Sequence, residues 1–257
     1  SWRMYQILII LICFNNETDI RPTIESVVNQ SYKDIEYIIV DGASTDSTLD
    51  IVNEYKAKIA KIISEPDRGL YDAINKGIRA ATGDIVGLIH AGDQLYDDDV
   101  ISKIVKIYEV YPDTQITYGH SKIFALDGTV KRVNKSPEFK RSLCKRGWFP
   151  SHQSIYARRE IFEQYGYYDT EIGWAADYHW FIKTFYVQNL NIRRLDEYVV
   201  RFALGGTSTS NYKSRLTKKH GDMMRNCWLA NGVKPPCCIV GWQIVRKIKQ
   251  ILLAKFE

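Results

Sequence analysis

The residues best suited to chemistry lie between positions 64 and 93, where a polar loop and a short helical segment lead into an apolar run and an acid. The apolar run at 85–90 predicts a buried strand, and Asp93 would stand where that strand ends. Open α/β sheets bind ligands outside the carboxyl ends of their strands. A carboxylate at this position is suited to hold a divalent cation and, through it, a phosphorylated ligand.

The elements that must position this acid alternate between strand and helix. Uninterrupted apolar runs at 7–13 and 37–40 are typical of strands buried on both faces of a parallel sheet. Apolar spacing and capping residues extend the pattern. The predicted elements are strands at 7–13, 37–40, 59–64 and 85–90 and helices at 20–30, from 46 or 47 to 58, and at 71–81. This order predicts an α/β fold with a doubly wound, mostly parallel sheet and right-handed crossovers.

The length of 257 residues can bury one large core, and no linker rich in Pro, Gly or Ser divides the chain. We therefore expect a domain at 1–210 and a helical C-terminal extension at 211–257. The five cysteines are scattered without metal-type spacing, which favours reduced thiols in the cytoplasm, although adjacent Cys237 and Cys238 leave a redox pair open. No segment approaches the roughly 20 apolar residues that span a bilayer.

The C-terminal extension combines charge with apolar surface. Its last part, 239–257, interleaves basic residues with apolar ones that fall mostly on one helical face. This pattern fits an amphipathic helix on an anionic membrane, and it fits equally a helix packed on its own domain with its lysines in water. The net charge of +5 is modest, and no basic and aromatic stripe forms a recognised module, so we expect no nucleic-acid partner.

Several ordered motifs resemble the family 2 glycosyltransferases, and together they cover most of residues 5–210. The motifs are the loop, helix and strand at 64–93, the Asp-Gly-Ala-Ser string at 40–48, a strand with a His-Gln pair at 149–156, an acidic helix start at 173–180 and a glycine-containing strand end at 201–208. The resemblance implies the Rossmann-like A-type glycosyltransferase fold, with a nucleotide-sugar half at about 1–120 and an acceptor half at 121–210.

The same resemblance implies a reaction. An inverting enzyme would move a sugar from a nucleotide-diphosphate donor to a hydroxyl of a saccharide or lipid-linked saccharide. The expected donor is a UDP-sugar. The sequence at 65–77 looks similar to that of bacterial enzymes that build surface polysaccharides at the inner face of the plasma membrane. A nucleotidyltransferase and a catalytically silent nucleotide-sugar binder stay open as alternatives.

On this resemblance, the donor would be bound by residues at the ends of the first strands. They are Cys13, Asn15, Asp41, Asp67, Arg68 and Gly92. Asp41 would contact the nucleotide base, and the Arg68 guanidinium would suit the diphosphate. Two simpler interpretations stay open, in which Asp41 opens a turn and Arg68 is an exposed loop residue.

The resemblance also implies a divalent cation, Mn²⁺ or Mg²⁺, held by Asp93. The family usually carries Asp-any-Asp at this place, whereas the stretch here is His90-Ala91-Gly92-Asp93. One carboxylate, water and the diphosphate itself can hold such an ion. His90 would either add a nitrogen ligand or form a hydrogen bond to the backbone.

The acceptor side is expected around the later motifs. Asp177 would be the catalytic base that takes a proton from the acceptor hydroxyl, or else the cap of the helix that follows it. His220 matches no motif and has no assigned role. The expected lining of the acceptor site and of a neighbouring loop is His152, Gln153, Trp174, Gly205 and Gly206.

Overall fold

The computed structural model describes residues 4–205 and 218–256. Within these ranges one nine-stranded sheet has the order β3-β2-β1-β4-β8-β6-β9-β5, and β7 pairs with β6. The strands are β1 (Ile7–Cys13), β2 (Ile35–Asp41), β3 (Lys61–Ser64), β4 (Ile85–His90), β5 (Gln94–Leu95), β6 (Ile116–Phe124), β7 (Val130–Asn134), β8 (Tyr156–Arg158) and β9 (Ile192–Ala203). Strands β1 to β4 are parallel, whereas β8 is antiparallel to both β4 and β6.

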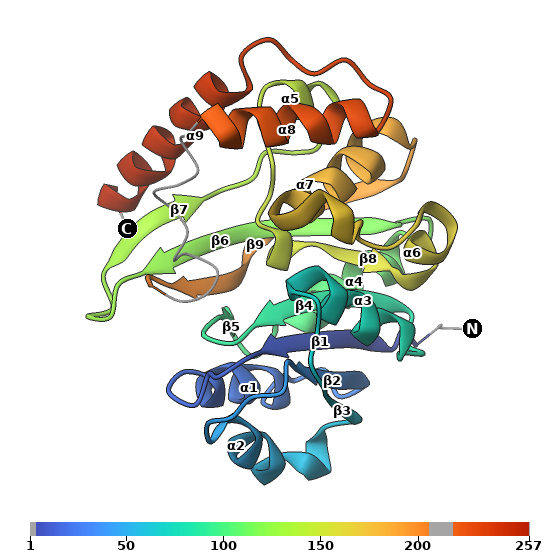
Figure 1. Ribbon diagram of the computed structural model, residues 1–257, viewed down its shortest axis with the longest axis vertical. Helices are drawn as coiled ribbons and strands as arrows, with labels where there is room; N and C mark the ends of the chain where they lie inside the picture. Colours follow the sequence, from blue (N-terminus) through green and yellow to red (C-terminus); the bar gives the residue numbers. More distant parts are fainter. Residues whose placement is uncertain (1–3, 206–217, 257) are drawn as a thin grey trace.

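Helices cover both faces of the sheet (Figure 1). They are α1 (Ile20–Val28), α2 (Thr48–Glu54), α3 (Leu70–Arg79), α4 (Val100–Val110), α5 (Ser142–Lys145), α6 (Arg159–Tyr165), α7 (Ala176–Phe181), α8 (Lys218–Ala230) and α9 (Ile239–Leu253). Short 3₁₀ helices are η1 (Lys56–Lys58), η2 (His152–Ser154), η3 (Thr170–Ala175) and η6 (Ala254–Phe256), and the π-helix η4 (Ile182–Val187) continues α7.

Two apolar cores lie on opposite faces of the sheet, and β1 contributes to both. Its odd-numbered residues pack with α1, α2 and α4, whereas its even-numbered residues belong to the core of α3, α6, α7 and α8. Successive side chains of a strand point to opposite faces, so a strand covered on both sides must be apolar throughout. The α/β fold with its doubly wound parallel first half is confirmed.

Most predicted elements lie where the sequence placed them, and the strands at 7–13 and 85–90 match β1 and β4 at both ends. The predicted helix to 58 is too long, because α2 ends at Glu54, Tyr55 leaves the helical backbone (φ −103°, ψ 10°), and Lys56–Lys58 form the separate 3₁₀ helix η1. The predicted strand at 149–156 is also wrong in its middle. Residues 152–154 form the turn η2, which is closed by hydrogen bonds to the carbonyls of 151 and 152.

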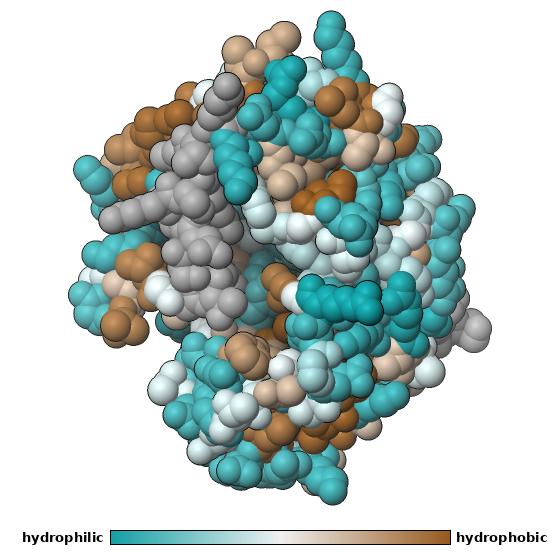
Figure 2. Space-filling model, viewed as in Figure 1, coloured by the Kyte–Doolittle hydropathy of each residue, from teal (hydrophilic) through white to brown (hydrophobic). Residues whose placement is uncertain are grey.

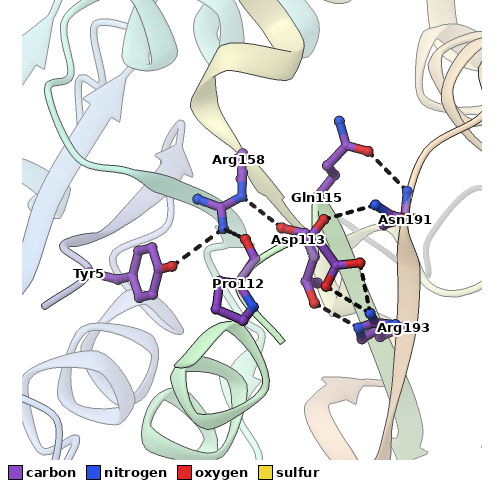
Figure 3. A network of polar contacts seen from close by, with 8 residues as sticks. Tyr5, Pro112, Asp113, Gln115, Arg158, Asn191 and Arg193 are labelled. Atoms are coloured by element: carbon purple, nitrogen blue, oxygen red, sulfur yellow. Dashed lines mark hydrogen bonds and ion pairs between the residues drawn. The ribbon is translucent and has the colours of Figure 1, made fainter. Parts of the chain in front are cut away.

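A polar network joins the two halves of the sheet (Figure 3). Arg158 of β8 donates to the Pro112 carbonyl at 2.7 Å and to the Tyr5 hydroxyl at 3.4 Å. Arg193 of β9 pairs with the Asp113 carboxylate at 2.9 Å. Because Tyr5 precedes β1, this network lies at the amino ends of the parallel strands. The network holds the two halves of the sheet together and leaves free the carboxyl ends of the parallel strands, where a ligand would bind.

The C-terminal extension consists of α8 and α9, which pack on each other, while α9 also packs on β7. The expected division at 210 lies outside the described residues. Among those that are described, no helix is both long and apolar enough to cross a bilayer. Of the cysteines, Cys13, Cys144 and Cys227 are buried thiols, whereas Cys237 and Cys238 are exposed thiols.

Candidate active site

The loops after β1 and β2 are tied together by Asp41 and Asn15. The fully buried Asp41 carboxylate accepts hydrogen bonds from the Ser44 N–H (3.0 Å), the Ser44 hydroxyl and the Ser64 hydroxyl (2.7 Å). Asn15 has a left-handed backbone (φ 50°); its N–H donates to the Ser44 hydroxyl and its amide oxygen accepts from the Thr45 N–H. Asp41 therefore does form the turn, and its contact with a nucleotide base stays a prediction.

Cys13 and Asp67 border the same loops. The Cys13 thiol lies 3.7 Å from the Asp41 carboxylate, and burial together with that negative charge raises its pKa, so it stays a neutral thiol. The Asp67 carboxylate lies against Gly42, where an added Cβ would stand 2.8 Å from it. Arg68 is exposed on the loop that follows β3. The loops after β1, β2 and β3 thus meet at one edge, as a donor site requires.

Asp93 follows β4 and is buried, with 1% of its surface exposed. Its carboxylate accepts a long hydrogen bond (3.4 Å) from the Gln153 amide, and the same nitrogen donates to Nδ1 of His90 at 3.2 Å. Gly92 shapes this turn with φ +97°, and its N–H donates to the Thr23 hydroxyl at 3.0 Å. Gln153 therefore bridges His90 and Asp93, the two polar residues of the His90-Ala91-Gly92-Asp93 stretch.

The surroundings of Asp93 fit a metal ion that takes most of its ligands from the substrate and from water rather than from protein side chains. Across 4–205 and 218–256, no group of three or more His, Cys, Asp or Glu side chains could hold a metal. Mg²⁺ is commonly held by one or two carboxylates together with substrate phosphates and water. A metal bond through Nδ1 of His90 would cost the hydrogen bond from Gln153. Asp93 fits as a single carboxylate ligand, and the ion itself stays a prediction.

Two buried histidines stand behind Asp93 in their neutral form. Burial lowers the pKa of His90 to about 4, reinforced by His152 and opposed by Asp177. Burial also lowers the pKa of His152 to about 4. Nε2 of His152 and the Tyr168 hydroxyl form a hydrogen bond of 2.6 Å. His152 and Gln153 are both buried, so neither side chain offers the open surface expected of an acceptor-site lining.

Asp177 lies in the first turn of α7. The helix begins at Ala176, and Ala175, with φ −101° and ψ 18°, is its N-cap residue. The alternative prediction that Asp177 caps this helix is therefore wrong, because the turn η3 leads directly into α7 and residue 177 is already helical. Its Oδ1 accepts the Tyr178 N–H at 2.7 Å.

Tyr71, from α3 in the expected nucleotide-sugar half, contacts the Asp177 region, and the sequence analysis missed this contact. Its hydroxyl donates to the Trp174 carbonyl at 3.1 Å and also lies in hydrogen-bonding contact with Asp177. Burial, and then the Asp177 charge, raise the Tyr71 pKa, so the hydroxyl remains a donor. The Asp177 charge also opposes the lowering of the His90 pKa, so half-buried Asp177 is within electrostatic reach of the histidine that Gln153 joins to Asp93.

Trp174 is the exposed member of this region, with 48% of its surface open to solvent. Its ring stacks on His220 of α8, with centroids 4.9 Å apart and planes at 15°. Nε2 of His220 donates to the Gln243 side-chain oxygen of α9 at 3.1 Å. His220, which matched no motif, is thus held beside Trp174, one of the residues expected to line the acceptor site. Gly205 is exposed after β9 with φ +89°, and Gly206 lies outside the described residues.

Sequence comparison decides which family this site belongs to. A family profile described as "Glycosyl transferase family 2" matches residues 8–166. The chain belongs to this family. It is 28% identical over 219 residues to the PGL/p-HBAD biosynthesis glycosyltransferase of Mycobacterium bovis, covering 82% of each chain. It is 30% identical over 180 residues to an uncharacterized glycosyltransferase of Mycobacterium tuberculosis, covering 68% of this chain and 67% of that one.

Solved structures share the fold of this family 2 glycosyltransferase at low identity. A shortened S. aureus TarS in complex with UDP-GlcNAc superposes with a TM-score of 0.69 at 17% identity, covering 98% of this chain and 72% of that chain. The Pyrobaculum calidifontis mannosyltransferase PcManGT, with GDP-Man and Mn²⁺, gives 0.68 at 18% identity, covering 95% and 70%. The chain spans 39% of a longer TarS chain. The expected family and A-type glycosyltransferase fold are confirmed.

Proposed function

We propose that this glycosyltransferase moves a sugar from a nucleotide-diphosphate donor, most simply a UDP-sugar, to a hydroxyl of a saccharide or lipid-linked saccharide, with inversion. The observation that carries the proposal is that buried Asp93, after β4, and half-buried Asp177, in the first turn of α7, are both near the same histidine, His90. Gln153 links Asp93 to His90, and the Asp177 charge acts on His90. Relatives of similar fold that hold UDP-GlcNAc, or GDP-Man with Mn²⁺, support the donor class.

The donor would lie across the loops that follow β1, β2 and β3, with its diphosphate toward Asp93. The exposed Arg68 would pair with the diphosphate, which guanidinium geometry suits. Asp93 would hold a Mn²⁺ or Mg²⁺ ion, and such an ion, when bound, offsets the negative charge that develops on the departing diphosphate. Asn15 and Asp41 keep the first two loops together around the nucleotide.

Asp177 would act as the catalytic base. Its carboxylate takes the proton of the acceptor hydroxyl while that oxygen forms the bond to the anomeric carbon and the bond to the diphosphate breaks. Because His90 and His152 are neutral near pH 7, they place no positive charge beside Asp177 that would weaken it as a base. Tyr71 holds the base from the donor half, and orientation of both substrates supplies further acceleration.

The transferred group and the place of action follow from the relatives and the resemblance. UDP-GlcNAc and GDP-Man in the similar structures favour a hexosyl or N-acetylhexosaminyl group. Acceptors of polysaccharide assembly on lipid carriers would place the enzyme in the cytoplasm, at the inner face of the plasma membrane.

The decisive experiment incubates the protein with a panel of nucleotide sugars and Mn²⁺ or Mg²⁺, with EDTA as the metal-free control. Free nucleotide diphosphate is measured with and without saccharide acceptors. We expect one UDP-sugar to release UDP, faster with the acceptor and not with EDTA. Pyrophosphate among the products would show a nucleotidyltransferase. Donor binding by calorimetry with no release across the panel would show a silent binder, and either result refutes the proposal.

A further inference from the structure

Helix α9 packs on the rest of the molecule through polar side chains. Gln243, Arg246 and Gln250 recur at intervals of three and four residues, so they share one face of the helix. Their partners, in order, are Nε2 of His220 at 3.1 Å, the carbonyl oxygen of Phe149 at 2.7 Å and the guanidinium of Arg132 at 2.5 Å. A helix on a globular domain normally buries its apolar face. Here the face turned inward is largely polar.

The opposite side of α9 exposes large apolar side chains. They are Trp242, Ile244, Val245, Ile248, Ile251 and Leu252, with Phe256 just beyond the helix. Figure 2 shows hydrophobic residues gathered over α9, at the upper left of that view. A contiguous apolar patch on the surface of a protein marks an interaction site. Turning α9 to bury this patch would break the hydrogen bonds of its inner face, so the exposure is built into the packing.

The segments that carry and flank the exposed face are rich in basic residues. Between 233 and 256 the chain has no acid, and its basic residues are Lys234, Arg246, Lys247, Lys249 and Lys255. The neighbouring stretch 130–147, which includes β7, has one acid, Glu138, and the basic residues Lys131, Arg132, Lys135, Lys140, Arg141, Lys145 and Arg146. Anionic lipids attract such clusters, and apolar side chains of an amphipathic helix enter the headgroup region.

We propose that α9 docks the enzyme on an anionic lipid bilayer, with its apolar face among the headgroups and its lysines against lipid phosphates. This rests on the proposed function, because it assigns the acceptor to the lipid-linked class. An anionic bilayer matches both the apolar face and the excess of basic residues around it. A protein partner would need an apolar groove and an acidic rim of its own to match them.

The docking helix lies on the acceptor side of the molecule. Gln243 binds His220, His220 stacks on Trp174, and Trp174 lies on the turn just before Asp177. Figure 1 shows α8 and α9 at the opposite end of the molecule from α1 and α2. A bilayer beneath α9 would therefore bring a sugar carried on a lipid toward the base, while the donor loops remain open to nucleotide from solution.

The test compares sedimentation of the whole protein with phosphatidylcholine vesicles that contain or lack phosphatidylglycerol. Val245→Glu/Ile248→Glu disrupts the apolar face, and Lys249→Glu/Lys255→Glu reverses two exposed charges. The matched control is Val110→Glu on α4, because Val110 is 51% exposed and lies far from α9 in the sequence. We expect wild type and control to bind the anionic vesicles and each double variant to bind at least about tenfold more weakly. All variants should retain UDP binding by calorimetry.

Three results would overturn the docking surface: wild-type protein that ignores anionic vesicles, a Val245→Glu/Ile248→Glu variant that binds them like wild type, or equal binding to neutral vesicles. A wild-type dimer in sedimentation velocity that this variant converts to a monomer would also overturn it, because a second copy would then cover α9. Each of these leaves the donor-release assay as an independent test of transfer. Vesicle binding without any release of UDP would instead support docking and refute the proposed function.

Discussion

Replacing Asp177 by Asn isolates the proposed base, because the structure separates the chemistry of this carboxylate from its structural contacts. Asn keeps the side-chain oxygen that accepts the Tyr178 N–H at 2.7 Å. The Tyr71 hydroxyl donates its single proton to the Trp174 carbonyl, a hydrogen bond that the substitution leaves in place. The variant loses a negative charge in the first turn of α7, which costs about 0.3–1 kcal/mol of folding stability. We therefore expect the fold and the donor site to survive.

The effect on transfer should be much larger than the effect on folding. An amide cannot accept the proton, and a positioned base is worth about 10²- to 10⁴-fold in rate. That loss corresponds to about 3–5 kcal/mol in the activation barrier. Turnover is measured as UDP release in the presence of the acceptor, and donor affinity by calorimetry with UDP and Mn²⁺ on the same preparation. Thermal unfolding of both proteins gives the stability difference.

Two results would show that this reasoning is wrong. Turnover of Asp177→Asn within a few-fold of wild type would mean that another group, or water, takes the proton. A parallel loss of turnover, donor affinity and thermal stability would mean that the charge of Asp177 holds the site together, and the base would then have to be sought elsewhere.

Three further perturbations test the neighbouring groups. Asp93→Ala should weaken Mn²⁺-dependent UDP binding in calorimetry and leave metal-free binding in place; an unchanged metal-dependent affinity would remove Asp93 as a ligand. Tyr71→Phe should lower kcat by about 5- to 10-fold, the worth of one hydrogen bond, with little change in KM. An unchanged kcat would show that Tyr71 contributes only its packing. Burial lowers the pKa of His90 and of His152 from 6.5 to about 4, so the unfolded chain binds more protons in this window. Stability in urea titrations should therefore be full above pH 6.5 and fall toward pH 4, and a flat profile would contradict the neutral buried histidines.

The first half of the fold could be predicted because three of its strands, β1, β2 and β4, are covered on both faces over most of their length. Every residue of β1 is buried, so burial appears in the sequence as an uninterrupted apolar run. The second half lacks this signal. Strand β8 has three residues and β5 has two, which is too short for any periodicity to show. These strands form because β4, β6 and β9 offer them backbone partners, which a local pattern does not contain.

The sequence could predict the individual residues of the candidate site but not the contacts between them. Asp41 and Asp93 stand at strand ends, where an acid after an apolar run is visible in the sequence. The bond from Tyr71 to the Trp174 carbonyl spans 103 residues, and the bond from Gln153 to Asp93 spans 60. Both depend on how two packed halves meet. Likewise, the amphipathic pattern of α9 was visible, but its inward face is decided by distant partners.

The distance between the two halves is set inside the sheet, at β4 and β8. These strands pair at two positions, Ile85 with Arg158 and Val86 with Ala157. One residue further along β4, an added Cβ on Gly87 would stand 2.1 Å from the Tyr156 ring, so this close approach requires glycine. Gln153 lies just before β8, and its reach to Asp93 depends on the same approach. The geometry of the candidate site therefore follows from a buried glycine as much as from the acids proposed to perform the chemistry.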